Sequence, residues 1–251
     1  MLSKIKNNVE KQLELYAGRL GRKARGTLRI PRLIDETIID FISRPCKRIR
    51  PVLLVIGYLG YCPRPRQGIY RSAVGLELLH DFLLIHDDII DRTAMRKGKP
   101  TMHCQLQRRL ARYPRLKFNG ADLATVIADI IYARALEEFC AGGEDPRRTQ
   151  TALATLLRTT ALTGYGEAAE LLAETRNLSG WTAADVFSIY DLKTANYTFC
   201  APLCAGSQLA GAHSRQVKDL ERFGMLVGRA FQIKDDLLDM FATEKEIGKT
   251  P

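Results

Sequence analysis

The stretch LIHDDIIDRTAMRKGKP (residues 84–100) places three aspartates within five residues, directly after an apolar run, and follows them with a basic cluster. The apolar run has helical spacing, and on a helix Asp87 and Asp91 share one face, with Asp88 beside them. Carboxylates this close repel one another unless a cation lies between them. Mg²⁺ suits such a site because it prefers hard oxygen ligands and often bridges carboxylates to phosphates. The alternative is a solvated acidic turn at the end of a helix.

The same acidic pattern recurs later in the chain. FQIKDDLLDMF (residues 231–241) repeats the spacing with Asp235, Asp236 and Asp239, again inside an apolar helical pattern. Two matching clusters on two long helices could face each other across a bundle and hold several Mg²⁺ ions around one diphosphate. The repetition favours a metal site over two unrelated acidic turns.

Helical periodicity dominates the rest of the chain. Apolar residues recur at spacings of three and four over residues 9–20, 71–91, 121–140, 149–175, 183–206 and 214–241, whereas period-two runs are scarce. We therefore predict an all-α fold, with a single domain over residues 1–251 built of long helices packed around a central cavity. Because the sequence ends on the polar stretch EKEIGKTP, we also expect this domain to lack its C-terminal helices.

Composition limits the partners and the compartment. The 251 residues carry a net charge of +10, which favours anionic partners such as nucleic acid, a membrane surface or phosphorylated small molecules. Two acidic clusters in apolar surroundings would repel nucleic acid, so we expect no nucleic-acid partner. No apolar run is long enough to span a bilayer, and the first residues lack the apolar core of a signal peptide. The cysteines show neither zinc-site spacing nor a CxxC pair. These features predict a cytoplasmic protein without an integral membrane segment.

Basic residues flank the acidic motifs. They are Lys47, Arg48 and Arg50 in CKRIRP, Arg96, Lys97 and Lys99 in RKGK, Lys193 in DLKT, and Lys249 in EIGK. Cations beside acidic clusters are what a phosphorylated ligand held with metals requires. Surface solubility is the alternative, and it fits basic residues far from the motifs better than it fits these.

In this order and combination, the motifs resemble those of the trans-isoprenyl diphosphate synthases, which include the farnesyl and geranylgeranyl diphosphate synthases. The matching elements are KRIRP, the first DDxxD, RKGKPTMH, KTANY, FQIKDDLLD and the GK that follows, and they span residues 45–249. The resemblance implies an all-α, homodimeric enzyme that depends on Mg²⁺ and uses three of these ions. Such an enzyme joins an allylic diphosphate head-to-tail to isopentenyl diphosphate.

The resemblance also implies a role for each motif residue. Direct Mg²⁺ ligands would be Asp87, Asp91 and Asp235, and their supports Asp88, Asp236 and Asp239. The allylic diphosphate would be held by Arg96, Lys193 and Lys249, and isopentenyl diphosphate by Lys47, Arg50, His80 and Lys97. Oxygens of Lys193, Thr194 and Gln232 would face the developing allylic cation.

Product length is expected to depend on the pocket below the first aspartate motif. Leu83 and Phe82 precede Asp87 by four and five residues, and we expect the Phe82 ring to lie deeper on the aspartate face and to form the floor of the pocket. The resemblance associates an aromatic residue at this place with short-chain synthases, which predicts a C15–C20 product with C20 favoured. An ordinary core position for Phe82 is the alternative.

Three departures from the family pattern bear on this site. Pro45 and Cys46 replace glycines before the basic motif. Lys97 replaces an arginine, so the positive charge is kept but the two-pronged contact that a guanidinium makes with a phosphate is lost. Glu167 and Glu170 stand where the family often has a glutamine and an aspartate. The sequence does not determine what these two acids do.

The segment CQLQRRLARYPRLKFN (residues 104–119) is more basic than the family pattern predicts. We expect it to be a surface loop. The alternative is a peripheral contact with anionic lipid, which would receive an apolar product.

Two other functions share part of this pattern. A class I terpene cyclase uses the same ionisation chemistry, but its second metal motif is normally not an aspartate-rich DDxxD, and it needs no second diphosphate site at Lys47 and Arg50. A non-catalytic partner subunit of a heteromeric prenyl synthase usually loses one acidic motif, whereas this chain keeps both. We therefore favour chain elongation over both alternatives.

Overall fold

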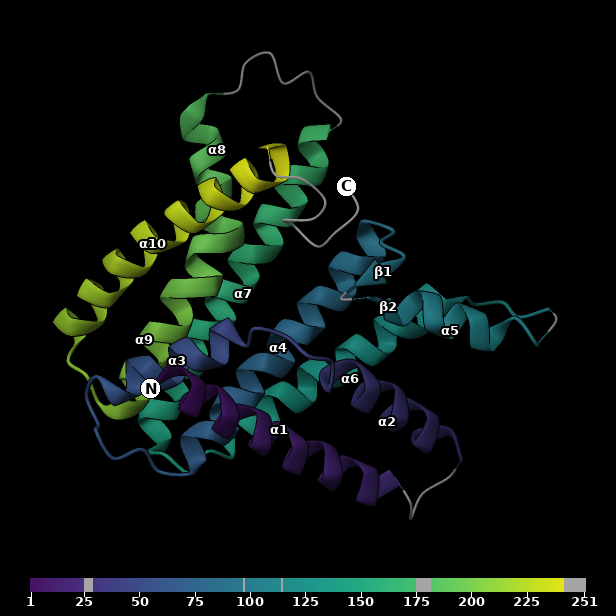
Figure 1. The fold of residues 1–251 in the computed structure, drawn as a ribbon, viewed down its shortest axis with the longest axis horizontal. Coiled ribbons are helices and arrows are strands. Elements are labelled where there is room, and N and C mark those ends of the chain that lie inside the picture. The colour runs from purple at the N-terminus through teal and green to yellow at the C-terminus, as the bar shows by residue number, and fades with distance from the viewer. Residues whose placement is uncertain (25–28, 97, 114, 175–181, 242–251) are drawn as a thin grey trace. The chain divides into compact units, whose positions relative to one another are not determined.

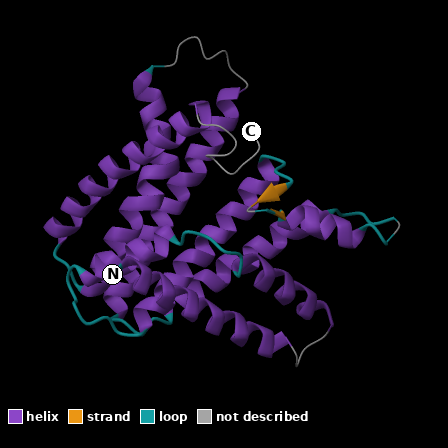
Figure 2. Cartoon of the chain, in the orientation of Figure 1, coloured by secondary structure: helices purple, strands orange, loops and turns teal. Residues whose placement is uncertain are grey.

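The regular structure of this chain is helical, which confirms the predicted all-α class (Figures 1 and 2). The computed structural model describes residues 1–24, 29–96, 98–113, 115–174 and 182–241. Its helices are α1 (Leu2–Ala24), α2 (Arg29–Ile42), α3 (Ile49–Leu59), α4 (Gly68–Ile90), α5 (Met102–Leu110), α6 (Gly120–Cys140), α7 (Pro146–Glu174), α8 (Ala183–Tyr190), the π-helix η2 (Asp191–Cys200), α9 (Ala201–Ala210) and α10 (Ser214–Phe241). A short antiparallel pair, β1 (Met95–Arg96) with β2 (Lys99–Pro100), is the one sheet within the described ranges.

The predicted helices are present, and all but one have similar bounds; the helix predicted over residues 9–20 is the longer α1, Leu2–Ala24. The segment predicted over residues 183–206 is continuously helical, but its middle part, η2, is a π-helix of ten residues. Helices of this type are rare and occur often at functional sites. Helices α2, α3 and α5 were not among the predicted segments, because short helices carry few periods of the apolar pattern.

The chain divides into two compact units. Unit 1 comprises Met1–Val52 and Arg66–Gly143, and unit 2 comprises Leu53–Pro65 and Glu144–Pro251. The prediction of one domain over residues 1–251 around a central cavity concerns how these units join, and it stays a prediction.

Helix α4 is the centre of unit 1, and α1, α2, α5 and α6 all contact it. Residues 72–79 of α4 are all buried, so this part of the helix is covered around its whole circumference. Burial of a large apolar side chain such as Leu76 or Leu78 stabilises the fold by about 1.5–3 kcal/mol. The same buried run contains Glu77, whose charge requires a partner inside the protein.

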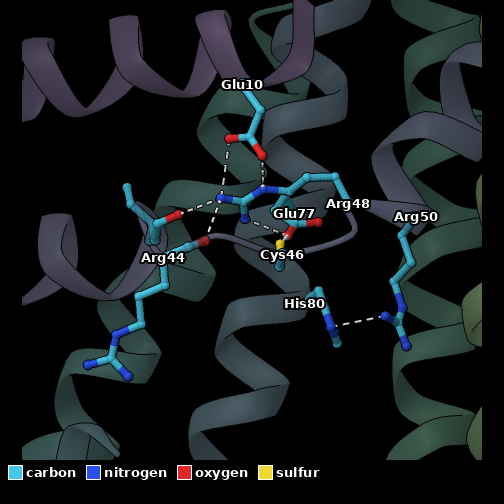
Figure 3. A network of polar contacts seen from close by, with 8 residues as sticks. Glu10, Arg44, Cys46, Arg48, Arg50, Glu77 and His80 are labelled. Atoms are coloured by element: carbon cyan, nitrogen blue, oxygen red, sulfur yellow. Dashed lines mark hydrogen bonds and ion pairs between the residues drawn. The ribbon is translucent and has the colours of Figure 1, made fainter. Parts of the chain in front are cut away.

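Arg48 supplies that partner and joins three parts of unit 1 (Figure 3). Its Nη1 donates to Glu77 Oε1 at 2.7 Å, and its Nε donates to Glu10 Oε1 of α1 at 3.0 Å. Its Nη2 donates to the carbonyl oxygens of Ile42 and Arg44 at the end of α2, at 3.0 and 3.1 Å. Burial lowers the pKa of the guanidinium, but the carboxylates raise that pKa by more, so the buried charge is retained. A backbone φ of 53° at Arg48, rare for a residue other than glycine, aims the side chain inward.

In unit 2, α10 contacts η2, α9 and α8, and its approach to η2 is unusually close. A Cβ at Gly228 would lie 2.4 Å from Cα of Ala195, and one at Gly224 would lie 2.8 Å from Cα of Cys200. Side chains at these two positions would therefore force the helices apart. Gly224 and Gly228 are four residues apart, so they form one face of α10 against η2.

The absence of an integral membrane segment was also predicted from the sequence. None of the described helices combines the length and the apolar character needed to cross a bilayer. All six cysteines are free, but only Cys200 and Cys204 are buried, and Cys140 is exposed. Burial raises the pKa of both buried thiols to about 12, so they stay protonated at neutral pH.

Replacement of Gly228 by alanine tests the close approach of α10 to η2. Because the new Cβ meets the backbone of Ala195, Gly228→Ala should lower the free energy of unfolding by about 1–3 kcal/mol, measured by urea denaturation. The control is Gly164→Ala in α7, where a Cβ meets nothing within 4 Å. This control should raise stability by about 0.5–1 kcal/mol, because alanine favours the helix. Equal shifts in the two variants would contradict the packing described for Gly228.

The buried Arg48–Glu77 pair leads to a second stability prediction. Glu77→Gln keeps the shape of the side chain but removes its charge, which leaves Arg48 partly uncompensated in the interior. Breaking such a pair should lower the free energy of unfolding by about 3 kcal/mol. The matched control is Glu36→Gln, which breaks the exposed Arg32–Glu36 pair on α2 and should change stability by only about 0.5 kcal/mol. A small effect at both positions would show that Glu10 and the carbonyl contacts suffice to hold Arg48 without the charge of Glu77.

Candidate active site

A basic pocket of about 390 Å³ lies in unit 1 where α3 begins beside α4. It is lined by Pro45, Cys46, Lys47, Arg48, Ile49, Arg50, Glu77 and His80. Its lining residues come from the loop after α2, the first turn of α3 and one face of α4. Because Glu77 offsets the charge of Arg48, Lys47 and Arg50 are the cations that make the pocket suited to an anionic ligand.

The basic residues of the KRIR motif have different surroundings in the structure. Arg48 points inward to its carboxylate partners, whereas Lys47 is exposed and Arg50 remains at the pocket (Figure 3). Arg50 Nη1 lies 2.9 Å from His80 Nε2, so a residue of α4 contacts a residue of α3 at the pocket wall. Of the residues predicted to hold isopentenyl diphosphate, Lys47, Arg50 and His80 are thus brought together. Lys97 lies outside the described residues.

Cys46, one of the departures from the family pattern, also lines this pocket. Its Sγ donates a hydrogen bond to Glu77 Oε1 at 3.3 Å, on the carboxylate that pairs with Arg48. The thiol therefore contributes to the buried network (Figure 3).

The first aspartate motif ends α4. Asp87 and Asp88 lie in the last turn, and Asp91 is the residue that caps the helix. The C-terminus of a helix carries partial negative charge, so each carboxylate there is disfavoured by about 0.3–1 kcal/mol unless a cation compensates. Arg96 of β1 supplies one cation: its Nε donates to Asp88 Oδ1 at 2.6 Å and its Nη2 to Asp87 Oδ2 at 2.9 Å. Arg96, predicted to hold the allylic diphosphate, therefore contacts the predicted metal ligand Asp87 and its predicted support Asp88.

Asp88 is the buried member of the motif, with 1% of its side chain exposed. Burial raises the pKa of Asp88, the charge of Asp87 raises that pKa further, and the guanidinium of Arg96 opposes both. Its Oδ2 is buried and has no hydrogen-bond partner among the described residues. An unsatisfied carboxylate oxygen with a second carboxylate beside it can accept a hard cation such as Mg²⁺.

Within the described residues, no three acidic, histidine or cysteine side chains are arranged around a common metal position. Mg²⁺ is usually bound through one or two carboxylates together with waters and substrate phosphates, so it does not require a complete protein cage. The Asp87 carboxylate therefore fits this ion, with the buried Asp88 beside it as a support and the remaining ligands supplied by other groups.

The second aspartate motif continues the glycine face of α10. Gln232 and Asp236 follow Gly224 and Gly228 at the same spacing of four, so all four residues are directed to the same side of the helix. Thr194 Oγ1 of η2 donates to Gln232 Oε1 at 2.7 Å, and Gln232 Nε2 donates to Asp236 Oδ1 at 2.8 Å. Three predicted site residues are thus connected in one chain of hydrogen bonds.

Tyr190 completes this chain of hydrogen bonds at the end of α8. Its hydroxyl donates to Asp236 Oδ2, and this bond, together with burial, raises the pKa of Tyr190 to about 12. Asp236 is therefore held by two donors, while Asp235 is exposed. The side chain of Asp239 and the whole of Lys249 lie outside the described part of the chain.

The two unexpected acids, Glu167 and Glu170, contact a predicted ligand of the allylic diphosphate. Lys193 Nζ lies 3.0 Å from Glu167 Oε2 and also donates to Glu170 Oε2. Although burial lowers the pKa of an ammonium group, the hydrogen bonds to Glu170 and Glu167 raise the pKa of Lys193 above its ordinary value. Lys193 therefore stays protonated, and its charge is offset by two carboxylates of α7.

Phe82 lies between α4 and α6. Its ring centroid is 4.8 Å from that of His86 and 5.0 Å from that of Tyr132 on α6. Leu84, on the same helix, instead lines a small polar cavity with Arg44, Asp81 and Arg96, among others. That Phe82 and Leu83 set product length stays a prediction.

Sequence reasoning missed the residues that hold the motifs in place. Glu77 was detectable, because a charged residue in the apolar run LELLHDF indicates a buried charge that needs a partner. Glu10 and Tyr190 belong to no motif, and only the tertiary contacts with Arg48 and Asp236 reveal them.

Comparisons with known proteins agree with the family resemblance found in the sequence. The chain matches the polyprenyl synthetase family over residues 31–251. It is 30% identical over 203 residues to the geranylgeranyl diphosphate synthase of Methanosarcina mazei, across 81% of this chain and 57% of that protein. It is 29% identical over 251 residues to the farnesyl diphosphate synthase of Bacillus subtilis, across 99% of this chain and 77% of that protein.

The fold has relatives among solved structures. A geranylgeranyl pyrophosphate synthase from Corynebacterium glutamicum, complexed with isoprenyl diphosphate and magnesium, superposes with a TM-score of 0.81 at 23% identity, over 97% of this chain and 70% of that chain. The chain spans 57%, 60% and 62% of the lengths of the geranylgeranyl diphosphate synthases of M. mazei, Saccharolobus solfataricus and Sulfolobus acidocaldarius. Because the family match covers most of the chain and the motifs occur in the expected order, this chain belongs to the polyprenyl synthetase family.

Proposed function

We propose that the chain is a Mg²⁺-dependent prenyltransferase that joins isopentenyl diphosphate head-to-tail to an allylic diphosphate. The observation that carries this proposal is the arrangement along α4. His80 lies at the basic pocket, and Asp87 follows seven residues later, about 10 Å along the helix axis. One rigid helix thus joins a site for one anion to a carboxylate site for a metal-bound anion. A terpene cyclase, which ionises a single diphosphate, has no use for the first of these sites.

The metal site is proposed to hold three Mg²⁺ ions. Asp87, Asp91 and Asp235 would be the direct ligands, and the chemistry supplied is neutralisation of charge on the leaving diphosphate. Asp88 and Asp236 would orient them, since Asp88 is buried against Arg96, and Asp236 is held by Tyr190 and Gln232. Asp239 is proposed to support the second motif in the same way.

Basic residues are proposed to hold the two diphosphates. Lys47, Arg50, His80 and Lys97 would bind isopentenyl diphosphate, and Arg96, Lys193 and Lys249 the allylic substrate. Arg96 is bidentate toward two carboxylates, a geometry that also suits phosphate oxygens. Oxygens of Lys193, Thr194 and Gln232 would face the allylic cation, the apolar side chains below the motifs would exclude water from it, and the departing diphosphate would accept the proton.

A short product, C15–C20 with C20 favoured, is proposed from the aromatic Phe82 and from the relatives named geranylgeranyl and farnesyl diphosphate synthases. We also propose that the chain forms a homodimer in the cytoplasm. There its sites for isopentenyl diphosphate and the allylic diphosphate would be open to these water-soluble substrates.

The activity is tested by incubating the purified chain with isopentenyl diphosphate, each allylic diphosphate and Mg²⁺, followed by product analysis. Asp87→Asn and Asp235→Asn should each lower kcat by about a hundredfold, because each removes a group that stabilises the leaving charge. The control Asp219→Asn, an exposed position on α10, should leave kcat unchanged. No condensation with any primer would refute the proposal, and a cyclic hydrocarbon product would favour the cyclase.

Phe82→Ala tests the proposed floor of the product pocket. Removal of the ring, which packs on Tyr132, should allow further additions of isopentenyl units and so lengthen the product, measured by chromatography of the dephosphorylated alcohols. Phe223→Ala on α10, where the ring is exposed, is the control and should not change chain length. An unchanged product from an active Phe82→Ala variant would assign Phe82 to ordinary core packing.

A further inference from the structure

The end of α5 and the connection that follows it carry a concentration of positive charge that the proposed chemistry does not use. We call residues 108–113 and 115–118 the arginine-rich loop, of which residues 108–110 are the last residues of α5. It contains Arg108, Arg109, Arg112, Arg115 and Lys117, and no acidic residue occurs between Asp91 and Asp122. In Figure 1 this connection extends beyond α5 and α6 at the right of the view.

The charges of the arginine-rich loop are directed to solvent. All five basic side chains are exposed, and none forms an ion pair with another described residue. Arg112 lies over an aromatic ring, with its guanidinium carbon 5.1 Å from the centroid of Tyr113. Arg115 has a φ of 65°, a left-handed conformation that glycine would adopt more readily. The loop therefore keeps a cation even where backbone conformation favours glycine.

Large apolar side chains stand among these cations. Tyr113, Leu116 and Phe118 are 52%, 39% and 45% exposed, although they lie within six residues of one another. Single exposed apolar residues are common, but several together mark a surface that meets an apolar partner.

Both ends of the loop are firmly held, so these exposures are not the result of a frayed terminus. Asn119 caps α6 by accepting hydrogen bonds from the backbone nitrogens of Ala121 and Asp122, at 2.7 and 3.1 Å. Gln107 Oε1 of α5 accepts a hydrogen bond from the nitrogen of Gly120 at 2.8 Å. The loop is thus presented from two anchored helices.

We propose that the arginine-rich loop docks the chain onto an anionic phospholipid surface. Arginine and lysine would contact the headgroups, while Tyr113, Leu116 and Phe118 would enter the interface, where aromatic and aliphatic side chains are favoured. Each basic residue near such a surface contributes about fivefold in affinity. The proposal is independent of the prenyltransferase activity, because it rests only on the charge and exposure of the loop.

Charge and apolar exposure together favour lipid over two other partners. A second copy of this chain related by a two-fold axis through the loop would place five positive charges against five more. Nucleic acid would account for the arginines, but it offers no apolar layer for the aliphatic side chain of Leu116.

The proposal is tested by co-sedimentation of the purified chain with vesicles of phosphatidylcholine alone or mixed with phosphatidylglycerol. Binding should require the anionic lipid and weaken as salt rises. Arg108→Glu/Arg112→Glu should reduce binding at least tenfold. The matched control Arg64→Glu/Arg66→Glu makes the same change in net charge at two exposed arginines outside the loop, and it should bind like the parent.

A second variant separates the apolar part of the surface from the charges. Leu116→Ser/Phe118→Ser keeps every cation, so it should bind anionic vesicles several-fold more weakly and lose the binding that persists at high salt. Unfolding temperatures equal to that of the parent would show that both variants are folded.

Three results would overturn the proposal. Equal binding to neutral and anionic vesicles would remove the role of the arginines. A change in molar mass of the Arg108→Glu/Arg112→Glu variant by light scattering would assign the loop to contact between copies. Displacement from vesicles by a short oligonucleotide, with full binding retained by Leu116→Ser/Phe118→Ser, would assign it to nucleic acid.

Discussion

Acidic side chains on apolar helices are costly unless each has a positive or hydrogen-bonding partner, and this requirement organises both units. Glu77 lies inside α4, Asp87 and Asp88 lie at its negative end, and Asp236 lies on a face of α10. In every case at least one partner comes from outside the helix that carries the acid, so satisfying the acid also fixes how two segments of the chain approach. The same contacts that neutralise the carboxylates therefore build the scaffold of the candidate site.

The basic residues that pair with these carboxylates differ in how firmly the protein holds them. Arg48 is buried and makes bonds to two carboxylates and two carbonyls, so its role is to hold α1, α2 and α4 together. Arg96 is partly exposed and its ion pairs with described residues are those to Asp87 and Asp88, so the diphosphate of the proposed function could compete for it without unfolding the unit. Lys193 is intermediate, because Glu167 and Glu170 both hold it at the surface of α7. This gradation explains how neighbouring cations can serve stability in one place and ligand binding in another.

Close backbone contact has a comparable effect in unit 2. Gly224 and Gly228 let α10 approach η2, and the same spacing then directs Gln232 and Asp236 toward Thr194 and Tyr190. The aspartate motif is thus positioned by small residues two and three turns earlier in the same helix. The arginine-rich loop is the opposite case, since its basic side chains are exposed without an ion pair to another described residue, and Tyr113, Leu116 and Phe118 are partly exposed among them.

The amino-acid sequence by itself determined the all-α class, most helix positions and the motif residues, because helical periodicity and the DDxxD spacing are local patterns. It also indicated the family, since the motifs recur in a fixed order. Only the tertiary structure decided that Arg48 faces inward while Arg50 faces the pocket, and that Arg96 contacts the aspartates. It likewise revealed Glu10 and Tyr190 as supports of the site. Such pairings depend on which segments pack together and on how deeply each side chain is buried, and neither is encoded in a local sequence pattern.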